Sequence, residues 1–227
     1  MNRGDILAKA TRIAFFCKDG ILKQKYYTFE YFGGFAASQK VKCINSFHKE
    51  ISLDETSNIL EVSRKSENII GNLLSAFNLL IEYAEHKYPV ECIYQSSKCF
   101  GNIQYHDCLN MEPGDAKRYV KKQVEELKLN LTSFNLFGVK FQLEPKSFFY
   151  DYLYIWALSQ NKDLANDIVK YDCFTDVEFN HKKQYASQAR SCAIFKKLYI
   201  NNLVERYLDA PNEFIHIYDF LNERTLL

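Results

Sequence analysis

The sequence predicts an α+β fold in which helices predominate and a small antiparallel or mixed sheet packs with them. Two β-branched and aromatic runs, 12–17 and 21–32, flank Asp19-Gly20, and this dipeptide between two such runs is typical of a β-hairpin. A shorter apolar run at 59–63 predicts a third strand. Much of the later chain repeats apolar residues at helical spacing, which predicts that helices dominate.

The composition is that of a compact globular protein. The 227 residues are 47% hydrophobic and 15% aromatic, and glycine and proline are scarce at 8 and 4 residues, which excludes a disordered or fibrous chain. This length is enough to bury a full core. We therefore expect a single domain, with an N-terminal hairpin and helix in 1–58, a core in 59–204 and a C-terminal helix in 205–227.

The charge balance excludes a protein that binds polyanions through its overall field. The formal net charge is +1, from 29 basic and 28 acidic residues, so nucleic-acid contact requires a local basic patch. One compact patch lies on a helix predicted from Ala116. It consists of Lys117, Arg118, Lys121 and Lys122, followed by Glu125 and Glu126. Mixed charge on a helix is usually solvent-facing, and the alternative is that Lys117, Arg118 and Lys121 contact DNA phosphates.

Signals for membranes, metals and cofactors are missing from the sequence. The start MNRGDILAK has no apolar signal-peptide core, and no later run is long and uncharged enough to span a bilayer, so we expect a cytoplasmic protein. The seven cysteines are scattered without a CxxC pair, which predicts reduced thiols and no structural metal. The chain also lacks a glycine-rich phosphate loop and a GxSxG motif, and we expect no cofactor.

A helix is predicted to follow the hairpin. Gly33-Gly34 ends the second strand, and Ser38 is a candidate N-cap for a helix that runs to about Ile51. Its buried stripe is expected to consist of Val41, Ile44 and Phe47. The opposite face carries Lys40, Lys42, His48 and Lys49, which we interpret as a solvent-exposed face.

The most informative segment is YPVECIYQSSKCF, residues 88–100. Pro89 opens a predicted helix in which Glu91, Gln95 and Lys98 recur at i, i+4 and i+7 and therefore lie on one stripe. The other face is apolar and aromatic. The polar stripe either faces solvent, as charged helix faces commonly do, or lines a pocket for a polar substrate.

Three other segments carry further candidates for a site. Arg64-Lys65-Ser66 follows the predicted third strand, and strand ends hold site residues on a rigid backbone. Segment 70–78 mixes small, amide and apolar residues, which suits either a surface close to a ligand or a core helix. Segment 174–180 places Asp176, Glu178 and Asn180 at alternate positions, hence on one side of the chain if the segment is extended.

The rest of the chain is predicted to be largely helical. After an irregular stretch or short hairpin at 130–141, an aromatic helix at 147–160 carries Trp156, which we expect to serve core packing rather than base stacking. Helices at 162–170 and 188–204 follow. An amphipathic helix from Asp209 either closes the domain or docks a partner.

Three blocks, in this order, resemble the NADAR (YbiA-like) family of ADP-ribose-processing proteins. The family's strand followed by a lysine corresponds to 60–65, and its glycine with a Ser-Asn-Phe-like motif corresponds to Gly71 and 74–78. Its helix motif Glu-x-x-aromatic-Gln-x-x-Lys-x-Phe corresponds to 91–100, and 115–118 resembles its Ala-Lys-Arg segment. The resemblance implies a YbiA-like NADAR fold.

One branch of the family is more similar, the NADAR antitoxins encoded beside DarT-type DNA ADP-ribosyltransferase toxins. Segments 29–35 with 38–40, 149–154 and 174–180 carry this resemblance, which spans about 29–204. Ala76 and Asn78 depart from the wider family, and 174–180 replaces its Trp-Gly-Asp-Gly-like segment.

The resemblance implies a glycohydrolase that removes ADP-ribose from guanine bases in DNA and acts as antitoxin to a DarT-type toxin. Breaking the glycosidic C–N bond passes through an oxocarbenium-like state, which a carboxylate such as Glu91 would stabilise. A lysine is expected to attack the anomeric carbon and form a Schiff base. Lys65, at the strand end that matches the family's lysine, ranks ahead of Lys98, which shares the stripe of Glu91.

Further residues are expected to bind the substrate. They are Ser75, Phe77, Asn78, Gln95, Asp176 and Asn180. The expected partners are ADP-ribosylated DNA, ADP-ribose and the cognate toxin, with no metal. Two alternatives remain, namely an antitoxin that binds ADP-ribose or the toxin without catalysis, and an N-glycosidase that acts on a riboflavin-pathway intermediate.

Overall fold

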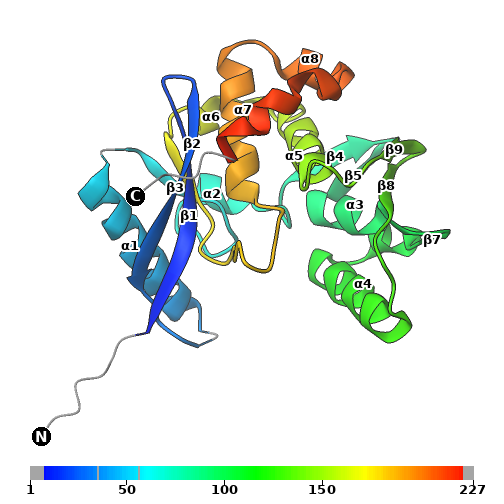
Figure 1. Ribbon diagram of the computed structural model, residues 1–227, viewed down its shortest axis with the longest axis horizontal. Helices are drawn as coiled ribbons and strands as arrows, with labels where there is room; N and C mark the ends of the chain where they lie inside the picture. Colours follow the sequence, from blue (N-terminus) through cyan, green and yellow to red (C-terminus); the bar gives the residue numbers. More distant parts are fainter. Residues whose placement is uncertain (1–7, 35, 56, 222–227) are drawn as a thin grey trace, which may run out of the picture.

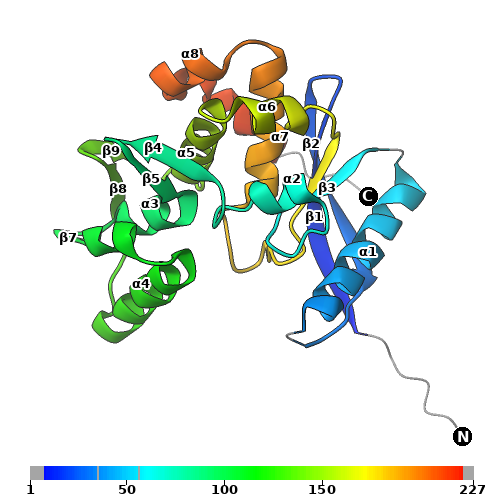
Figure 2. The same cartoon turned by 180° about the vertical axis from the view of Figure 1, so that it is seen from behind.

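The computed structural model describes residues 8–34, 36–55 and 57–221, with the side chains of 220 and 221 left aside. Its strands form three small sheets, and helices cover more of the described residues than strands do, which confirms the predicted α+β class. The first seven residues of the predicted N-terminal segment and the last six of the predicted C-terminal helix lie outside the described residues. Figures 1 and 2 show the main sheet with α1 on one side of the molecule and the smaller sheets with α3 and α4 on the other.

The main sheet is built from the predicted hairpin and two short strands. The order is β2 (Ile21–Glu30), β1 (Lys9–Lys18), β10 (Cys173–Thr175) and β3 (Ile59–Glu61). The hairpin is antiparallel around Asp19-Gly20, both with positive φ, and the predicted third strand joins its sheet as expected. The added strand β10 lies between β1 and β3 and runs parallel to β3. The carboxyl ends of β3 and β10 therefore meet at one edge.

Helix α1 (Ala37–Asp54) packs against the main sheet. Its N-cap is Ala36 rather than Ser38, and its buried residues include Ile44 and Phe47. His48 was assigned to a solvent-exposed face, and this prediction was wrong. Its ring Nε2 lies 2.8 Å from Thr175 Oγ1, and burial lowers the pKa of His48 to about 4.

The informative segment 88–100 is a helix only in its first half. Helix α3 spans Val90–Ser96, and Lys98–Phe100 forms strand β6, so the prediction of a helix to Phe100 was wrong. Strand β6 pairs with β7 (Ile103–Gln104) and β8 (Ser133–Leu136). The pairing of β6 with β8, whose residues lie more than thirty positions away, overrides the local helical period.

The remaining elements largely follow the predicted order. The predicted short hairpin at 130–141 is β8 with β9 (Val139–Phe141), and the basic helix α4 spans Pro113–Leu127. The other elements are α2 (Ile69–Leu73), β4 (Leu80–Tyr83), β5 (His86–Pro89), η1 (His106–Asn110), α5 (Phe148–Ser159), α6 (Lys162–Ile168), α7 (Gln188–Ile200), α8 (Val204–Asp209) and the 3₁₀ helix η2 (Pro211–Leu221). Helix α7 ends before Val204, and the predicted last helix is a 3₁₀ helix.

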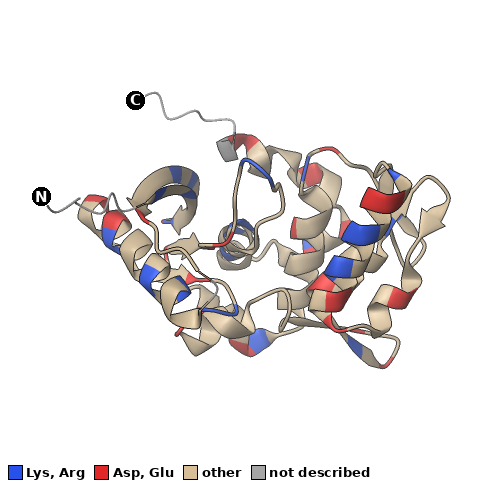
Figure 3. Ribbon diagram, turned by 90° about the horizontal axis from the view of Figure 1, so that it is seen from below, with Lys and Arg blue, Asp and Glu red and all other residues tan. Residues whose placement is uncertain are grey.

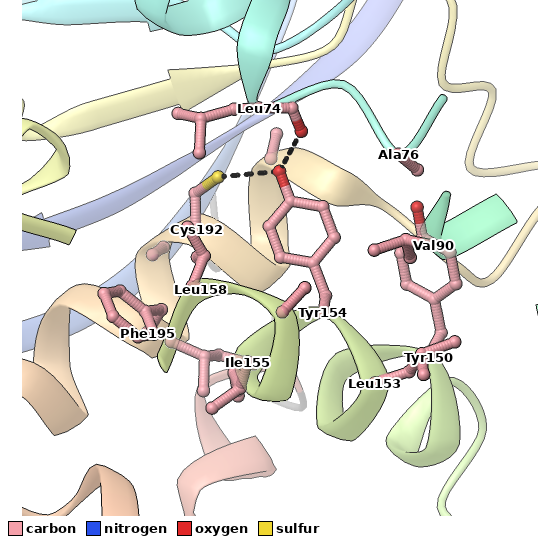
Figure 4. Packing of buried hydrophobic residues seen from close by; sticks show 14 of the residues in the cluster. Leu74, Ala76, Val90, Tyr150, Leu153, Tyr154, Ile155, Leu158, Cys192 and Phe195 are labelled. Atoms are coloured by element: carbon pink, nitrogen blue, oxygen red, sulfur yellow. Dashed lines mark hydrogen bonds between the residues drawn. The ribbon is translucent and has the colours of Figure 1, made fainter. Parts of the chain in front are cut away.

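Helices α5 and α7 form the centre of the largest apolar cluster (Figure 4). Tyr154 of α5 is fully buried, donates a hydrogen bond to the carbonyl of Leu74, and lies 3.4 Å from Cys192 Sγ of α7. Trp156 packs at the edge of this cluster, as expected. Tyr154 thus fixes the start of segment 74–78 to the core.

Gly71 of α2 lies against the end of strand β3. A Cβ at this position would sit 1.9 Å from the carbonyl oxygen of Glu61, so only glycine allows this approach. The close contact sets α2 and the segment after it beside the carboxyl end of β3.

Among the described helices, none combines the length and the apolar character needed to cross a bilayer.

Candidate functional site

A cavity of about 410 Å³ lies where the carboxyl ends of β3 and β10 face α3 and α4. Its lining comes from six parts of the chain: the residues after β3, segment 75–77, α3 with β6, Lys117 of α4, Tyr150 of α5, and segment 176–188. We call the face formed by Glu91, Gln95 and Lys98 the α3 side, and the face formed by Asp176 and Glu178 the loop side. The volume is in the range of small-molecule sites in proteins.

The α3 side is a chain of hydrogen bonds. Gln95 donates from Nε2 to Glu91 Oε1 at 2.8 Å, and Lys98 donates from Nζ to Gln95 Oε1 at 2.8 Å. Glu91 is only 5% exposed, so the stripe faces the cavity rather than solvent. The turn from α3 into β6 still leaves Lys98 beside Gln95, which keeps the three predicted groups together.

Lys98 is placed to exist partly as a neutral amine. Burial lowers the pKa of Lys98 to about 8, against the opposing influence of the Glu91 carboxylate. Its Nζ also lies 4.7 Å from the centre of the Tyr94 ring. A lysine with a pKa near 8 has a substantial unprotonated fraction at neutral pH, which is the form that can attack a carbon atom.

The loop side holds a buried acid. Asp176 is 9% exposed, and its Oδ1 accepts hydrogen bonds from the backbone N–H of Glu178 at 3.1 Å and of Phe179 at 3.2 Å. Burial and the neighbouring Glu61 and Glu178 carboxylates together raise the pKa of Asp176 to about 8. Asp176 therefore carries a proton at neutral pH.

Glu61 lies behind Asp176 at the end of β3. Its Oε2 accepts from Thr175 Oγ1 at 2.7 Å and its Oε1 from the N–H of Val177 at 3.0 Å. Burial raises the pKa of Glu61, while these hydrogen bonds oppose the shift. Thr175 also contacts His48, so Glu61, Thr175 and His48 form one buried network.

Segment 174–180 does not meet the condition of being extended over its whole length. Strand β10 ends at Thr175, and the N–H of Phe179 bonds the carbonyl of Asp176 at 3.0 Å in a turn. Asp176 and Glu178 line the cavity, whereas Asn180 does not. The side chain of Asn180 instead accepts from the N–H of Lys182 at 3.1 Å.

The residues after β3 divide between the cavity and its surroundings. Arg64 lines the cavity with its guanidinium carbon 4.3 Å from the centre of the Phe77 ring. Lys65, ranked first as nucleophile from the sequence, is not among the lining residues. Ser75 and Phe77 line the cavity, but Asn78 is turned away and donates to the carbonyl of Asn72 at 2.9 Å.

The three predicted DNA-contacting residues of α4 differ in position. Lys117 lines the cavity with its Nζ 3.9 Å from Glu91 Oε1. Arg118 makes an ion pair with Asp115 outside it, and Lys121 lies one turn further along. Figure 3 shows the basic bands of α4 between acidic ones.

Several lining residues were missed from the sequence. Gln188, at the start of α7, donates from Nε2 to the carbonyl of Val62 at 2.6 Å and accepts from the N–H of Ala76 at 2.9 Å, so it joins two parts of the lining. Tyr150 and Lys183 also line the cavity. Tyr150 lies in the block 149–154 that carried the resemblance, but Gln188 and Lys183 had no signal in the sequence.

Within the described ranges, no three His, Cys, Asp or Glu side chains are grouped so as to hold a metal ion.

Comparison with known proteins identifies the family of this chain. A comparison with curated proteins finds no match. The family model of the DarT1-associated NADAR antitoxins matches residues 10–225, which include both sides of the cavity and all elements from β1 to η2 except the first residue of β1. The chain therefore belongs to the family of DarT1-associated NADAR antitoxins.

Proposed function

We propose that this protein is an ADP-ribosyl glycohydrolase that removes ADP-ribose from guanine bases in DNA and so counteracts a DarT1 toxin. The observation that carries the proposal is the chain Glu91–Gln95–Lys98, which ends in an amine of lowered pKa inside a cavity large enough for a nucleotide-sized ligand. The toxin association follows the name of the family.

In the proposed reaction Lys98 is the nucleophile. Its neutral Nζ adds to the anomeric carbon of the ribose while the bond from that carbon to the guanine nitrogen breaks. The electron pair of that bond goes to the nitrogen, which takes up the proton held by Asp176. Glu91 stabilises the positive charge that develops on the sugar and accepts a proton from Nζ.

Hydrolysis then restores the enzyme. The ribose ring opens to an imine on Nζ as the remaining proton of Nζ passes to the ring oxygen, which becomes a hydroxyl group. Water adds to the imine carbon, and Nζ leaves as an amine, which releases ADP-ribose. Gln95 orients Lys98 and Glu91 through its two hydrogen bonds. Ser75, Phe77 and the cations Arg64 and Lys117 are proposed to contact the sugar and the diphosphate.

The geometry favours Lys98 over Lys65 as the nucleophile. Lys98 lines the cavity and contacts the Glu91 chain, whereas Lys65 follows Arg64 outside the lining. Asn78 and Asn180 likewise lie outside the lining, so we propose no contact of either with the sugar.

The proposal is tested with an ADP-ribosylated oligonucleotide. We expect release of free ADP-ribose and, when sodium borohydride is present, a covalent ADP-ribose adduct on Lys98. The adduct should be absent in Lys98→Ala and present in Lys65→Ala. Retention of the oligonucleotide without release of ADP-ribose would indicate a non-catalytic antitoxin, and cleavage only of a small N-glycoside would indicate the riboflavin-pathway alternative.

A further inference from the structure

A second recess opens beside the cavity, between α4 and β6. It has a volume of about 330 Å³ and is more open than the cavity. We call it the α4–β6 groove. Its apolar floor consists of Phe100, Val120, Val124 and Leu131. Lys121 is exposed and lies on its rim. Three further lining residues are shared with the cavity.

The groove and the cavity share one boundary. Gln95, Lys98 and Lys117 line both recesses, so a ligand longer than either one passes beside Lys98. A nucleophile approaches the anomeric carbon from the face opposite the departing nitrogen. Lys98 lines both recesses, so it can attack a sugar in the cavity while the rest of a longer ligand runs past it into the groove.

The two recesses differ in chemical character. The cavity is lined by carboxylates as well as cations, including Glu91, Asp176 and Glu178. Among the described residues that line the groove, three are lysines and none is acidic, and the rest are apolar apart from Gln95. Apolar surface with lysines at its edge suits a nucleobase or deoxyribose together with backbone phosphates.

The helical period of α4 explains this lining. Lys117, Val120, Lys121 and Val124 follow the spacing i, i+3, i+4, i+7 and so form one stripe facing the groove. Arg118 and Lys122 lie off that stripe, and each pairs with an acidic residue of the same helix. The surface ion pair of Lys121 with Glu125, at 3.7 Å, is weak enough for a phosphate to replace it.

We propose that the α4–β6 groove holds the DNA strand next to the modified guanine, with ADP-ribose and that guanine in the cavity and the scissile bond between Lys98 and Asp176. Lys121 contacts a phosphate of the strand, and the apolar floor contacts a base or sugar next to the modified guanine. This inference rests on the proposed function and adds to it the path of the DNA strand.

The test compares Lys121→Glu with Lys122→Glu on two substrates. Both lysines are exposed and both pair with a glutamate four residues on, so they are matched apart from the groove. With an ADP-ribosylated oligonucleotide, Lys121→Glu should raise KM by about tenfold at low salt and reduce the salt dependence by about one phosphate contact. Lys122→Glu should change KM by less than about twofold. With ADP-ribosylated guanosine, neither variant should change kcat/KM by more than about twofold.

Equal effects of the two variants on the oligonucleotide, or an equal loss with Lys121→Glu on the guanosine substrate, would overturn the inference. If the wild type released no ADP-ribose from either substrate, the proposed function would fail instead. Binding of an unmodified single-stranded oligonucleotide, followed by fluorescence anisotropy, then tests the groove without turnover. Selective weakening by Lys121→Glu supports the groove, and no selective weakening contradicts it.

Discussion

The α3 side and the loop side of the cavity both present buried carboxyl groups, but the two sides surround them differently. Glu91 on the α3 side accepts a hydrogen bond from Gln95 and faces Lys117 at 3.9 Å. Asp176 on the loop side lies near Glu61 and Glu178, and burial with these like charges raises its pKa to about 8. One cavity thus offers a carboxyl surrounded by donors and a second that retains a proton.

This difference separates two chemical tasks. Groups whose surroundings shift their pKa values in different ways serve as base and acid in one reaction. Lys98 and Asp176 both titrate near pH 8, but burial has moved the lysine down and the acid up to that value. The α3 side therefore suits nucleophilic attack, and the loop side suits protonation of the leaving base.

Removal of the nucleophile should have the largest effect. Lys98→Ala is expected to lower kcat for an ADP-ribosylated oligonucleotide by at least about 10³-fold, because it removes the amine that the Glu91–Gln95 chain holds in the cavity. Lys98→Arg, which keeps the charge but not the nucleophile, should be equally inactive. Lys65→Ala should remain within about threefold of the wild type. An inactive Lys65→Ala together with an active Lys98→Ala would indicate that Lys65, and not Lys98, is the nucleophile.

The two carboxyls should respond differently to replacement by amides. Glu91→Gln is expected to lower kcat by about 10²-fold, since it removes the negative charge that stabilises the sugar cation and the base that accepts the Nζ proton, although its amide oxygen can still accept from Gln95. Asp176→Asn should lower kcat by about tenfold, since guanine can take a proton from water more slowly. Circular dichroism spectra of both variants check that the fold is intact. The same loss in both variants would remove the distinction between the two sides.

The pH profile sharpens the same comparison. Activity should rise as Lys98 loses its proton and fall as Asp176 loses its own, so kcat/KM should peak near pH 8. In Asp176→Asn the alkaline fall should disappear and the rise should remain. Measurement of kcat/KM from pH 6 to 10 for both proteins tests this, and an unchanged alkaline limb in the variant would exclude Asp176 as the acid.

The loop side should also affect stability. An Asp in the unfolded chain loses its proton near its ordinary pKa of 3.8, whereas folded Asp176 keeps its proton up to about pH 8. The folded state therefore binds more protons between these values, and the free energy of unfolding falls as pH rises from about 4 to 8. Over this range the free energy of unfolding should fall less in Asp176→Asn than in the wild type, and the two falls should differ by more than about 1 kcal/mol. Urea denaturation at pH 5 and 8 measures the difference.

The smallest expected effect concerns the anchoring of segment 74–78. Tyr154→Phe removes the hydroxyl that donates to the carbonyl of Leu74, and the free energy of unfolding should fall by about 1–2 kcal/mol. Activity should change by less than about threefold, because a second hydrogen bond also holds this segment. The backbone N–H of Glu91 donates it to the carbonyl of Ala76 at 2.9 Å. A large loss of activity with unchanged stability would mean that Tyr154 orients the α3 side directly.

Local patterns in the sequence predicted the parts of the fold that depend on neighbouring residues. The Asp19-Gly20 turn, a strand that begins at Ile59 and the aromatic helix α5 follow from residue type and spacing, and a short hairpin was one of the two alternatives for 130–141. The spacing of Glu91, Gln95 and Lys98 brought the α3 side together, even though α3 ends at Ser96. The close approach behind Gly71 involves a glycine of the family motif.

The tertiary structure alone decided which side chains meet at the cavity. Asp176 reaches it because β10 inserts between β1 and β3, and the hydrogen bond from Thr175 to Glu61 joins residues 114 positions apart in the sequence. Arg64 rather than Lys65 lines the cavity, and both lie in the turn after β3, where the N–H of Ser66 donates to the carbonyl of Ser63 at 3.0 Å. The sequence by itself determined the α3 side and the hairpin, since in each of them the interacting residues lie close together in the sequence. The loop side and the α4–β6 groove arise from contacts between distant segments, which local periodicity does not encode.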